Sequence, residues 1–382
     1  MQTKKSIKRK IIPSCLISLL MAMVCIPNQL CFAATADNGS SSNSSVSSTT
    51  IYDGPDIDKT LKGNLQGTNP IKFHMDIAPG NYDVTVEFGN NSTSSSTAVQ
   101  GEARRSMLGD ISTSSGKFSK QTFTINVRNP EGQPTGQDGT GTPGLDLTFS
   151  GSAPKVNGIG VVAAKNPTMV YIAGDSTVCD RPSAPYAGWG EMLPQNFKLG
   201  TCIANYADCG ESSGSFLSNS KLFPAIKKVL KANDYVLIQF GHNDKSTTTA
   251  DYKKNLNTYI SDCKKVGAIP ILVTPPVRRV FNSDKKTLTP TALHINTVGT
   301  DIPTAMKEVA TANNVKLIDL TSKSKSLVES LGIEGSKKLY LTTAKDGFDD
   351  NTHFSEYGAT EMSKLVIQGI KELKLPLVSN LR

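Results

Sequence analysis

The stretch MVYIAGDST, residues 169–177, joins an apolar run to a short turn that carries Asp175 and Ser176. The same change from an apolar run to glycine or polar residues recurs after CIANYA (202–207), YVLIQF (235–240), IPILVT (269–274) and VKLID (315–319). Between these runs lie helical patterns such as AIKKVLKA (225–232) and DYKKNLNTYISDCKKV (251–266). Apolar strands that alternate with helices predict a parallel sheet covered by helices on both faces.

The preceding region, residues 51–164, has short runs of alternating apolar and polar residues broken by Gly, Asn, Pro and Ser. IKFHMDIAPGNYDVTVEFG (71–89) is typical of two strands joined by a Pro-Gly-Asn turn. Many short strands of this kind predict a small antiparallel β-sandwich. We therefore expect a sandwich at 51–164 and an α/β domain at 165–382.

The N-terminus has the composition of an export signal. The basic segment MQTKKSIKRK is followed by the apolar run IIPSCLISLLMAMVCI and then by small residues, which predicts a signal peptide at 1–34. A membrane anchor is the alternative, but Pro13 and Pro27 bound a run shorter than the roughly 20 apolar residues of a spanning helix. The Ser-rich residues 35–50 predict a linker. We expect a secreted, extracellular protein without membrane attachment after signal removal.

Removal of this signal would lower both the net charge and the number of cysteines. The formal net charge is +8, and five of the positive charges belong to the signal: Lys4, Lys5, Lys8, Arg9 and Lys10. The basic balance therefore indicates export rather than binding to nucleic acid. Four of the seven cysteines lie beyond the signal and permit either disulfides or buried thiols: Cys179, Cys202, Cys209 and Cys263. Nothing in the sequence points to an oligomeric state.

The segment DDNTHFSEYGA, residues 349–359, supplies a base and an orienting carboxylate for a serine hydroxyl. A serine attacks near neutral pH only when a base takes its proton and a third group orients that base. Asp350 precedes His353 by three residues, so a short loop would let the carboxylate accept the Nδ1–H while Nε2 faces Ser176. Of the four histidines, only His353 has a carboxylate in this register. A solvated loop is the alternative.

Two further strand ends offer hydrogen-bond donors for an oxyanion. Asn243 follows the run 235–240, and its side-chain amide can donate to a developing negative charge. Gly210 follows the run 202–207, where the missing Cβ lets a backbone N–H approach a ligand closely. Taken singly, Asn243 also suits a turn and Ser176 a helix N-cap. Together they fill the roles that acyl transfer requires.

A second serine competes for the role of nucleophile. GESSG, residues 210–214, matches G-x-S-x-G, the nucleophile turn of α/β-hydrolases. That fold also requires an upstream HGGG-type oxyanion loop, which this sequence lacks, and Asp and His residues on separate later loops. We therefore predict that Ser212 starts a helix or donates hydrogen bonds, and that Ser176 is the nucleophile.

These motifs resemble the blocks of the SGNH/GDSL hydrolase superfamily: Gly174-Asp175-Ser176, Gly210, Gly241-x-Asn243-Asp244 and Asp350-x-x-His353. Within it, GDSTV, NYADCGESSGSF, YVLIQFGHNDK and DNTHFSEYGA are similar to rhamnogalacturonan acetylesterases, and APGNYDVTVEFG to their bacterial two-domain members. The resemblance implies a flavodoxin-like, three-layer α/β/α fold. It also implies that the protein removes O-acetyl groups from plant cell-wall polysaccharide without a metal or a cofactor.

The resemblance assigns a role to each matching position. Ser176 would be the nucleophile, His353 the base and Asp350 the carboxylate that orients it. The backbone N–H groups of Ser176 and Gly210 and the side chain of Asn243 would bind the oxyanion.

The likeness breaks in the second block, where Glu211 and Gly214 occupy positions that are often arginine in the family. A glutamate there would repel an anionic galacturonate, so acetylated xylan is the alternative to pectic rhamnogalacturonan as substrate. Arg278 and Arg279 either compensate by binding substrate or form a solvated pair. Trp189, the only tryptophan, either stacks on a sugar ring or packs beneath a loop.

We therefore expect a carbohydrate O-acetylesterase whose partner is an acetylated plant polysaccharide, pectin or xylan. A broader short-chain esterase or lipase is the second enzymatic alternative, and a carbohydrate-binding surface protein is the non-enzymatic one. The sandwich is expected to be an accessory domain that either shapes one side of the cleft or binds sugar.

Overall fold

The structure, a computed structural model, describes residues 65–129, 143–342, 347 and 349–382. These residues all belong to one structural unit, Ser47–Arg382. The predicted signal peptide (1–34) and linker (35–50) lie outside the described residues, so both stay predictions. Among the helices of the described part, none combines the length and the apolar character needed to cross a bilayer.

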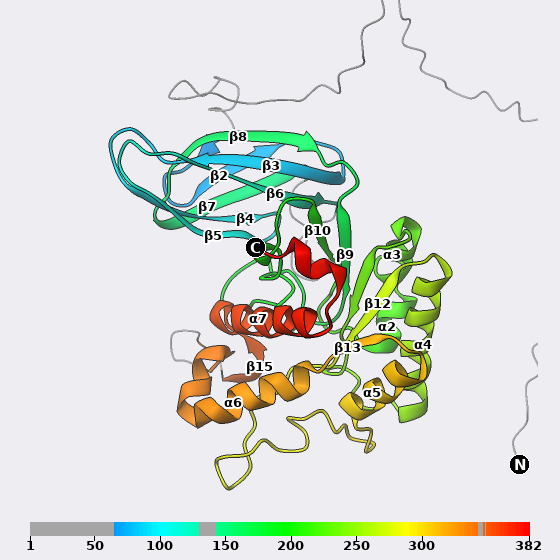
Figure 1. Cartoon of the computed structure of the whole chain (residues 1–382). Coiled ribbons are helices and arrows are strands. Elements are labelled where there is room, and N and C mark those ends of the chain that lie inside the picture. Colours follow the sequence, from blue (N-terminus) through cyan, green and yellow to red (C-terminus); the bar gives the residue numbers. More distant parts are fainter. Residues whose placement is uncertain (1–64, 130–142, 343–346, 348) are drawn as a thin grey trace, which may run out of the picture. The chain divides into compact units, whose positions relative to one another are not determined.

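The first eight strands form a β-sandwich (Figure 1). They are β1 (Leu65–Gln66), β2 (Ile71–Met75), β3 (Gly80–Phe88), β4 (Ser95–Gly101), β5 (Arg105–Thr113), β6 (Ser119–Val127), β7 (Leu145–Ala153) and β8 (Val156–Ala163). They pair antiparallel in two sheets, β1-β2-β7-β4-β5 and β6-β3-β8. Alternate residues point inward, and those of both sheets, among them Phe73, Val86 and Phe149, share one apolar core. The alternating pattern predicted this arrangement.

Five parallel strands form the second, central sheet. They are β9 (Thr168–Ala173), β10 (Thr201–Asn205), β11 (Tyr235–Ile238), β12 (Ile269–Val273) and β13 (Lys316–Ile318). Their order is β10-β9-β11-β12-β13, the strand order of flavodoxin-like folds. In register, Val170 of β9 lies between Ile203 of β10 and Tyr235 of β11.

Helices cover both faces of the central sheet (Figure 1). One face carries α2 (Ser213–Ser218), α3 (Phe223–Val229), α4 (Thr249–Lys265) and α5 (Ile302–Ala312), and the other carries α6 (Leu320–Ser336) and α7 (Glu356–Glu372). Phe216, Tyr252 and Met306 belong to the core of the first face, whereas Val328 and Val366 belong to that of the second. Because alternate residues of β9 enter the two cores, its sequence is apolar from Met169 to Ala173. The predicted three-layer α/β/α fold is confirmed.

A small two-stranded sheet precedes α7. It pairs β14 (Tyr340–Leu341) with β15 (Asp350–Phe354), so the segment expected as a loop is a strand. Ser355 follows this strand and caps α7, because its side chain accepts the N–H of Gly358 at 3.1 Å. Short 3₁₀ helices of the described part are η1 (Pro194–Asn196), η2 (Lys337–Leu339) and η4 (Pro376–Asn380).

Candidate active site

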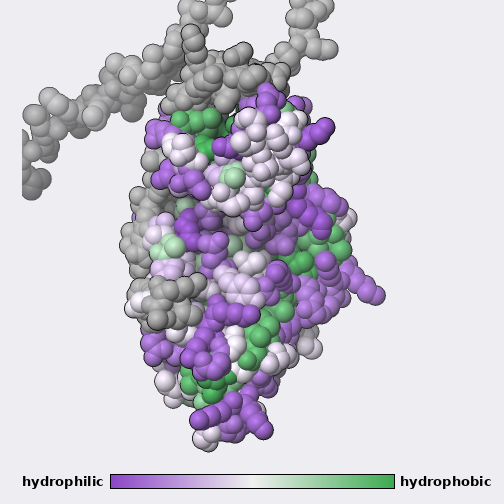
Figure 2. All heavy atoms as spheres, turned by 90° about the vertical axis from the view of Figure 1, so that its left-hand side faces the viewer, coloured by the Kyte–Doolittle hydropathy of each residue, from purple (hydrophilic) through white to green (hydrophobic). Residues whose placement is uncertain are grey.

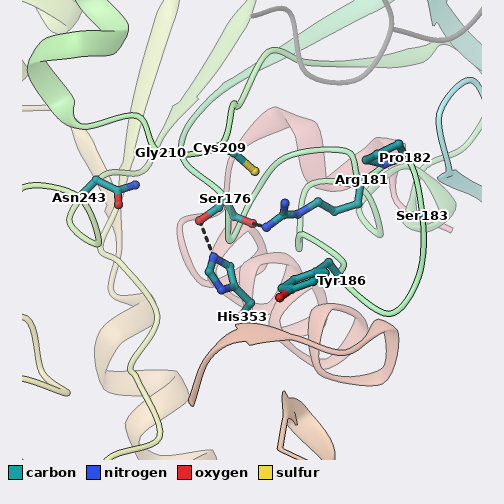
Figure 3. Close-up of a pocket in the computed structure, with 9 residues that line it drawn as sticks. All are labelled: Ser176, Arg181, Pro182, Ser183, Tyr186, Cys209, Gly210, Asn243 and His353. Atoms are coloured by element: carbon teal, nitrogen blue, oxygen red, sulfur yellow. Dashed lines mark hydrogen bonds between the residues drawn. The ribbon is translucent and has the colours of Figure 1, made fainter. Parts of the chain in front are cut away.

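The carboxyl ends of three parallel strands meet at a pocket of about 710 Å³ (Figure 3). Ser176 follows β9, Gly210 follows β10 and Asn243 follows β11, while His353 reaches the pocket from β15. Such a crevice at the carboxyl ends of strands is where open α/β sheets bind ligands. The lining residues are Ser176, Arg181, Pro182, Ser183, Tyr186, Cys209, Gly210, Asn243 and His353.

Ser176, His353 and Asp350 form a continuous line of hydrogen bonds. Ser176 Oγ lies 2.9 Å from His353 Nε2, and His353 Nδ1 lies 2.7 Å from Asp350 Oδ2. With its hydrogen on Nδ1, the ring donates to the carboxylate, and Nε2 accepts the serine hydroxyl proton. Figure 3 shows the hydroxyl pointing at the ring. The three groups can therefore act as nucleophile, base and orienting group.

Asp350 is held in its ionised form. Burial alone would raise the pKa of its carboxyl, but hydrogen bonds from the His353 ring and from two backbone N–H groups lower this pKa to about 2. Its Oδ1 accepts the N–H of Thr352 at 2.8 Å and that of His353 at 3.0 Å. At neutral pH a carboxylate therefore faces Nδ1–H and favours the tautomer that leaves Nε2 as acceptor.

Gly210 and Asn243 are the candidate oxyanion donors beside the serine. Gly210 has a φ of +79°, in the left-handed region that favours glycine. A Cβ would meet nothing within 4 Å, so backbone conformation rather than lack of space requires glycine. Asn243 donates through Nδ2 to the carbonyl of Glu211 at 3.1 Å, which leaves its second amide hydrogen for a ligand. This bond holds the loops after β10 and β11 together.

A buried polar network supports the turn that carries Ser176. The Asp175 carboxylate accepts the backbone N–H of Thr177 at 2.9 Å, its hydroxyl at 2.7 Å and Gln239 Nε2 at 3.1 Å. His242 Nδ1 lies 3.4 Å from the same carboxyl group. Burial would raise the pKa of Asp175, but His242 and Thr177 lower it to about 2. Nothing in the sequence indicated that the His242 ring would take part in this network.

The burial of Trp189 contradicts the expectation that it stacks on a sugar ring. Its side chain has no exposed surface, and its Nε1–H donates to Gln239 Oε1 at 2.9 Å. A buried ring has no face on which a sugar can stack, so the packing alternative holds.

Arg278 and Arg279 do not line the pocket, contrary to the expectation that they bind substrate there. Arg278 donates to the carbonyl of His242 at 2.9 Å and to the hydroxyl of Thr352 at 2.5 Å. Arg279 donates to Asn351 Oδ1 at 2.8 Å. The two guanidinium groups brace β15, and Arg278 ties that strand to the loop after β11. Both side chains therefore hold the strand that carries His353, and neither reaches this pocket.

The GESSG segment starts a helix, as predicted. Ser212 is the N-cap of α2, and its side chain accepts the N–H of Ser215 at 3.2 Å. The carboxylate of Glu211 accepts hydrogen bonds from the Ser215 hydroxyl and the Asn219 side chain. Glu211 is not among the pocket residues, so the carboxylate expected to repel an anionic sugar is turned toward the helix instead.

No motif in the sequence pointed to one wall of the pocket, which is formed by the segment 180–186. The Tyr186 ring lies edge-on to the His353 ring, with centroids 5.5 Å apart and planes at 77°. The Arg181 guanidinium lies over the same tyrosine ring at 4.9 Å and donates to the Ser176 carbonyl at 3.4 Å. RPSAPY follows the nucleophile turn closely in sequence, but it has no periodicity from which the directions of its side chains can be predicted.

Two thiols lie at the edge of the same site. The sulfur atoms of Cys179 and Cys209 are 3.7 Å apart, and no disulfide joins the four cysteines of the described part. Burial raises the pKa of the Cys179 thiol, which favours its protonated form. Within residues 65–129, 143–342, 347 and 349–382, no three His, Cys, Asp or Glu side chains are grouped as metal ligands.

A family model described as GDSL-like lipase/acylhydrolase matches residues 170–366, which is more than half of the chain. The chain belongs to this family. It is accordingly a carboxylic ester hydrolase of the SGNH/GDSL type, and the resemblance seen in the four sequence motifs is confirmed.

Three Bacillus subtilis proteins are similar in sequence to this chain. Rhamnogalacturonan acetylesterase RhgT is 40% identical over 230 residues, which are 57% of this chain and 95% of RhgT. The probable rhamnogalacturonan acetylesterase YesY is 35% identical over 221 residues, 56% of this chain and 96% of YesY. The uncharacterized esterase YxiM is 30% identical over 308 residues, 78% of this chain and 74% of YxiM. The crystal structure of YxiM covers 81% of each chain at 26% identity, with a TM-score of 0.49.

Proposed function

We propose that this GDSL family member is a secreted polysaccharide O-acetylesterase and that its substrate is acetylated rhamnogalacturonan. The observation that carries the proposal is the Ser176–His353–Asp350 line of hydrogen bonds at a pocket that Gly210 and Asn243 also line. The names of RhgT and YesY, which match over nearly their whole length, support the substrate class.

In the proposed first step, Ser176 Oγ attacks the acetyl carbonyl while His353 Nε2 takes the hydroxyl proton. Asp350 stabilises the imidazolium that forms. The developing oxyanion accepts hydrogen bonds from the N–H groups of Ser176 and Gly210 and from the Asn243 amide, which are fixed before the reaction begins. When the tetrahedral intermediate collapses, the bond to the sugar oxygen breaks and His353 gives its proton to that oxygen, so the sugar leaves with a free hydroxyl and an acetyl-serine remains.

The second step restores the enzyme. Water replaces the sugar and gives a proton to His353 Nε2 as its oxygen attacks the acetyl-serine carbonyl. The same oxyanion donors act again, and collapse of the second intermediate returns the proton from His353 to Ser176 Oγ. Acetate leaves.

The polarity of the site supports a sugar ester over a long acyl chain. Six of the nine residues that line the pocket have polar side chains, among them Arg181, Ser183 and Asn243. On the face shown in Figure 2, hydrophobic residues outside the grey atoms form separate patches among hydrophilic ones. The carboxylate of Glu211 is hydrogen-bonded toward α2 and does not line the pocket, which weakens the argument against an anionic polymer.

Acetate release tests the substrate directly. We expect faster release from acetylated rhamnogalacturonan than from acetylated xylan at equal acetyl content, because no described carboxylate lines the pocket and Arg181 does. Ser176→Ala is the control for release that the active site does not cause. Comparable or faster release from xylan would contradict the rhamnogalacturonan assignment but retain the esterase. No Ser176-dependent release from any acetyl ester would favour a carbohydrate-binding protein.

The acid side of the pH profile should reflect a single protonation. The carboxyl pKa of Asp350, lowered to about 2, keeps this group ionised throughout the assay range, so only the base needs to lose a proton. We expect log(kcat/KM) to fall with a slope of about one as the pH decreases below the optimum. Steady-state kinetics should be combined with circular dichroism at each pH to verify that the protein stays folded. A slope of two would show that the carboxyl titrates with the base.

A further inference from the structure

The wall of the pocket formed by residues 180–186 is in contact with the β-sandwich. This segment runs from the turn of Ser176 to Tyr186, whose ring lies against His353. A shift of Tyr186 would therefore change both the shape of the pocket and the surroundings of the base. The contacts that hold the segment come from the turn between β4 and β5 and from β5 itself.

Arg104, in the turn between β4 and β5, holds the far end of this wall. Its Nη1 donates to the backbone carbonyl of Tyr186 at 2.9 Å. Its Nη2 lies 3.3 Å from Glu356 Oε2 and 3.6 Å from Glu191 Oε1. Glu191 has no exposed surface, and its other oxygen accepts the N–H of Arg181 at 2.9 Å. Arg104 thus acts on the wall at Tyr186 directly and at Arg181 through Glu191.

Arg105, the first residue of β5, holds the near end. Its Nε lies 3.2 Å from Asp180 Oδ2, and the two side chains are at most 1% exposed. The same guanidinium donates to the carbonyl of Ile203 in β10 at 3.1 Å and to that of Asn126 in β6 at 2.6 Å. The other oxygen of Asp180 accepts Asn205 Nδ2 at 2.8 Å. Because both charges of a buried ion pair lose their hydration, the pair adds little to the stability of the fold. Its effect here is to fix Asp180, at the start of the wall, relative to β5.

We propose that the β-sandwich holds one wall of the active-site pocket in place. Arg104 and Arg105 are positioning residues that hold the wall 180–186, so that the Tyr186 ring lies beside His353 and contacts the sugar next to the ester. The inference rests on the proposed esterase function. Of the two roles expected for the accessory domain, shaping the cleft and binding sugar, this inference favours the first.

The decisive experiment compares Arg104→Ala, Tyr186→Ala and the double variant with the wild-type protein. If Arg104 acts through Tyr186, each single variant raises KM for the acetylated polymer by about 5- to 20-fold. The double variant should then be no worse than Tyr186→Ala alone. Arg104→Lys keeps the charge beside Glu191 and should recover part of the loss.

A spectroscopic readout separates positioning from general stability. The Cε1 proton of His353, assigned by its loss in His353→Gln, should shift in Arg104→Ala toward its position in Tyr186→Ala, because the tyrosine ring current changes. Arg382→Ala is the matched control, since this arginine donates to the Thr122 carbonyl of the sandwich at 3.3 Å but does not line the active-site pocket. It should leave both KM and the resonance unchanged.

The outcomes distinguish this inference from the proposed function. A wild-type protein that releases no acetate from the polymer contradicts the proposed substrate, while the His353 resonance still tests the wall. Wild-type KM and an unshifted resonance in Arg104→Ala overturn the inference even if the esterase is confirmed. Additive losses in the double variant overturn it as well. Should Arg104→Ala not fold, Arg104→Lys decides by the same two readouts.

Discussion

Ser176→Ala is expected to lower kcat on acetylated substrate by about 10⁴-fold or more, with KM and the thermal unfolding temperature near their wild-type values. The hydroxyl lies 2.9 Å from His353 Nε2, and alanine in its place offers no nucleophile for acetyl transfer. What remains is catalysis by the oxyanion donors and the base acting on water. Initial rates of acetate release measure the loss.

Two serine variants serve as controls for this result. Ser183→Ala removes another hydroxyl from the same pocket and should keep kcat within the wild-type range. Ser212→Ala should also retain activity but lose about 1 kcal/mol of stability, because it removes the N-cap of α2. If Ser212→Ala abolished turnover and Ser176→Ala did not, the G-x-S-x-G serine would be the nucleophile after all.

Asp350→Asn is expected to lower kcat by about 10²- to 10⁴-fold at neutral pH, with little change in KM. Asparagine has nearly the same shape, and its carbonyl oxygen can still accept the N–H groups of Thr352 and His353. Its amide group would then face His353 Nδ1 and favour the tautomer with hydrogen on Nε2. In that tautomer the ring cannot accept the proton of Ser176.

Asp349→Asn is the matched control, because it makes the same substitution at the exposed neighbouring carboxylate. It should retain wild-type kcat. Steady-state kinetics of both variants on one acetyl ester give the comparison. A loss of less than tenfold in Asp350→Asn, about 1.4 kcal/mol in the activation free energy, would show that the carboxylate contributes little to catalysis.

Much of the fold was predictable because burial on two faces leaves a clear signal in sequence. β9 from Met169 onward and β11 are apolar since both of their faces enter a core, whereas β3 alternates from Val84 to Phe88 because only one face does. The sequence did not predict that residues 350–354 form a strand. The partner of that strand is only two residues long, Tyr340–Leu341, and too short to have a pattern.

The candidate site was predictable where its parts are close in sequence or follow a strand. The register of Asp350 and His353 predicted their hydrogen bond, and the ends of β9, β10 and β11 predicted that Ser176, Gly210 and Asn243 lie together. Parallel strands end at one edge of the sheet, so position along the chain translates into position in space. The catalytic roles of these residues are the subject of the variants above.

By itself the sequence determined the layered α/β/α fold and the preceding sandwich, and it predicted Ser176 rather than Ser212 as the nucleophile. The tertiary structure alone decided that Trp189 is buried, that Arg278 braces β15, and that Arg104 of the sandwich contacts the wall of the pocket. The reason is physical. Periodicity reports which face of a strand or helix is buried, but a side chain in an irregular loop takes its direction from whatever packs against it, and that neighbour can come from anywhere in the chain.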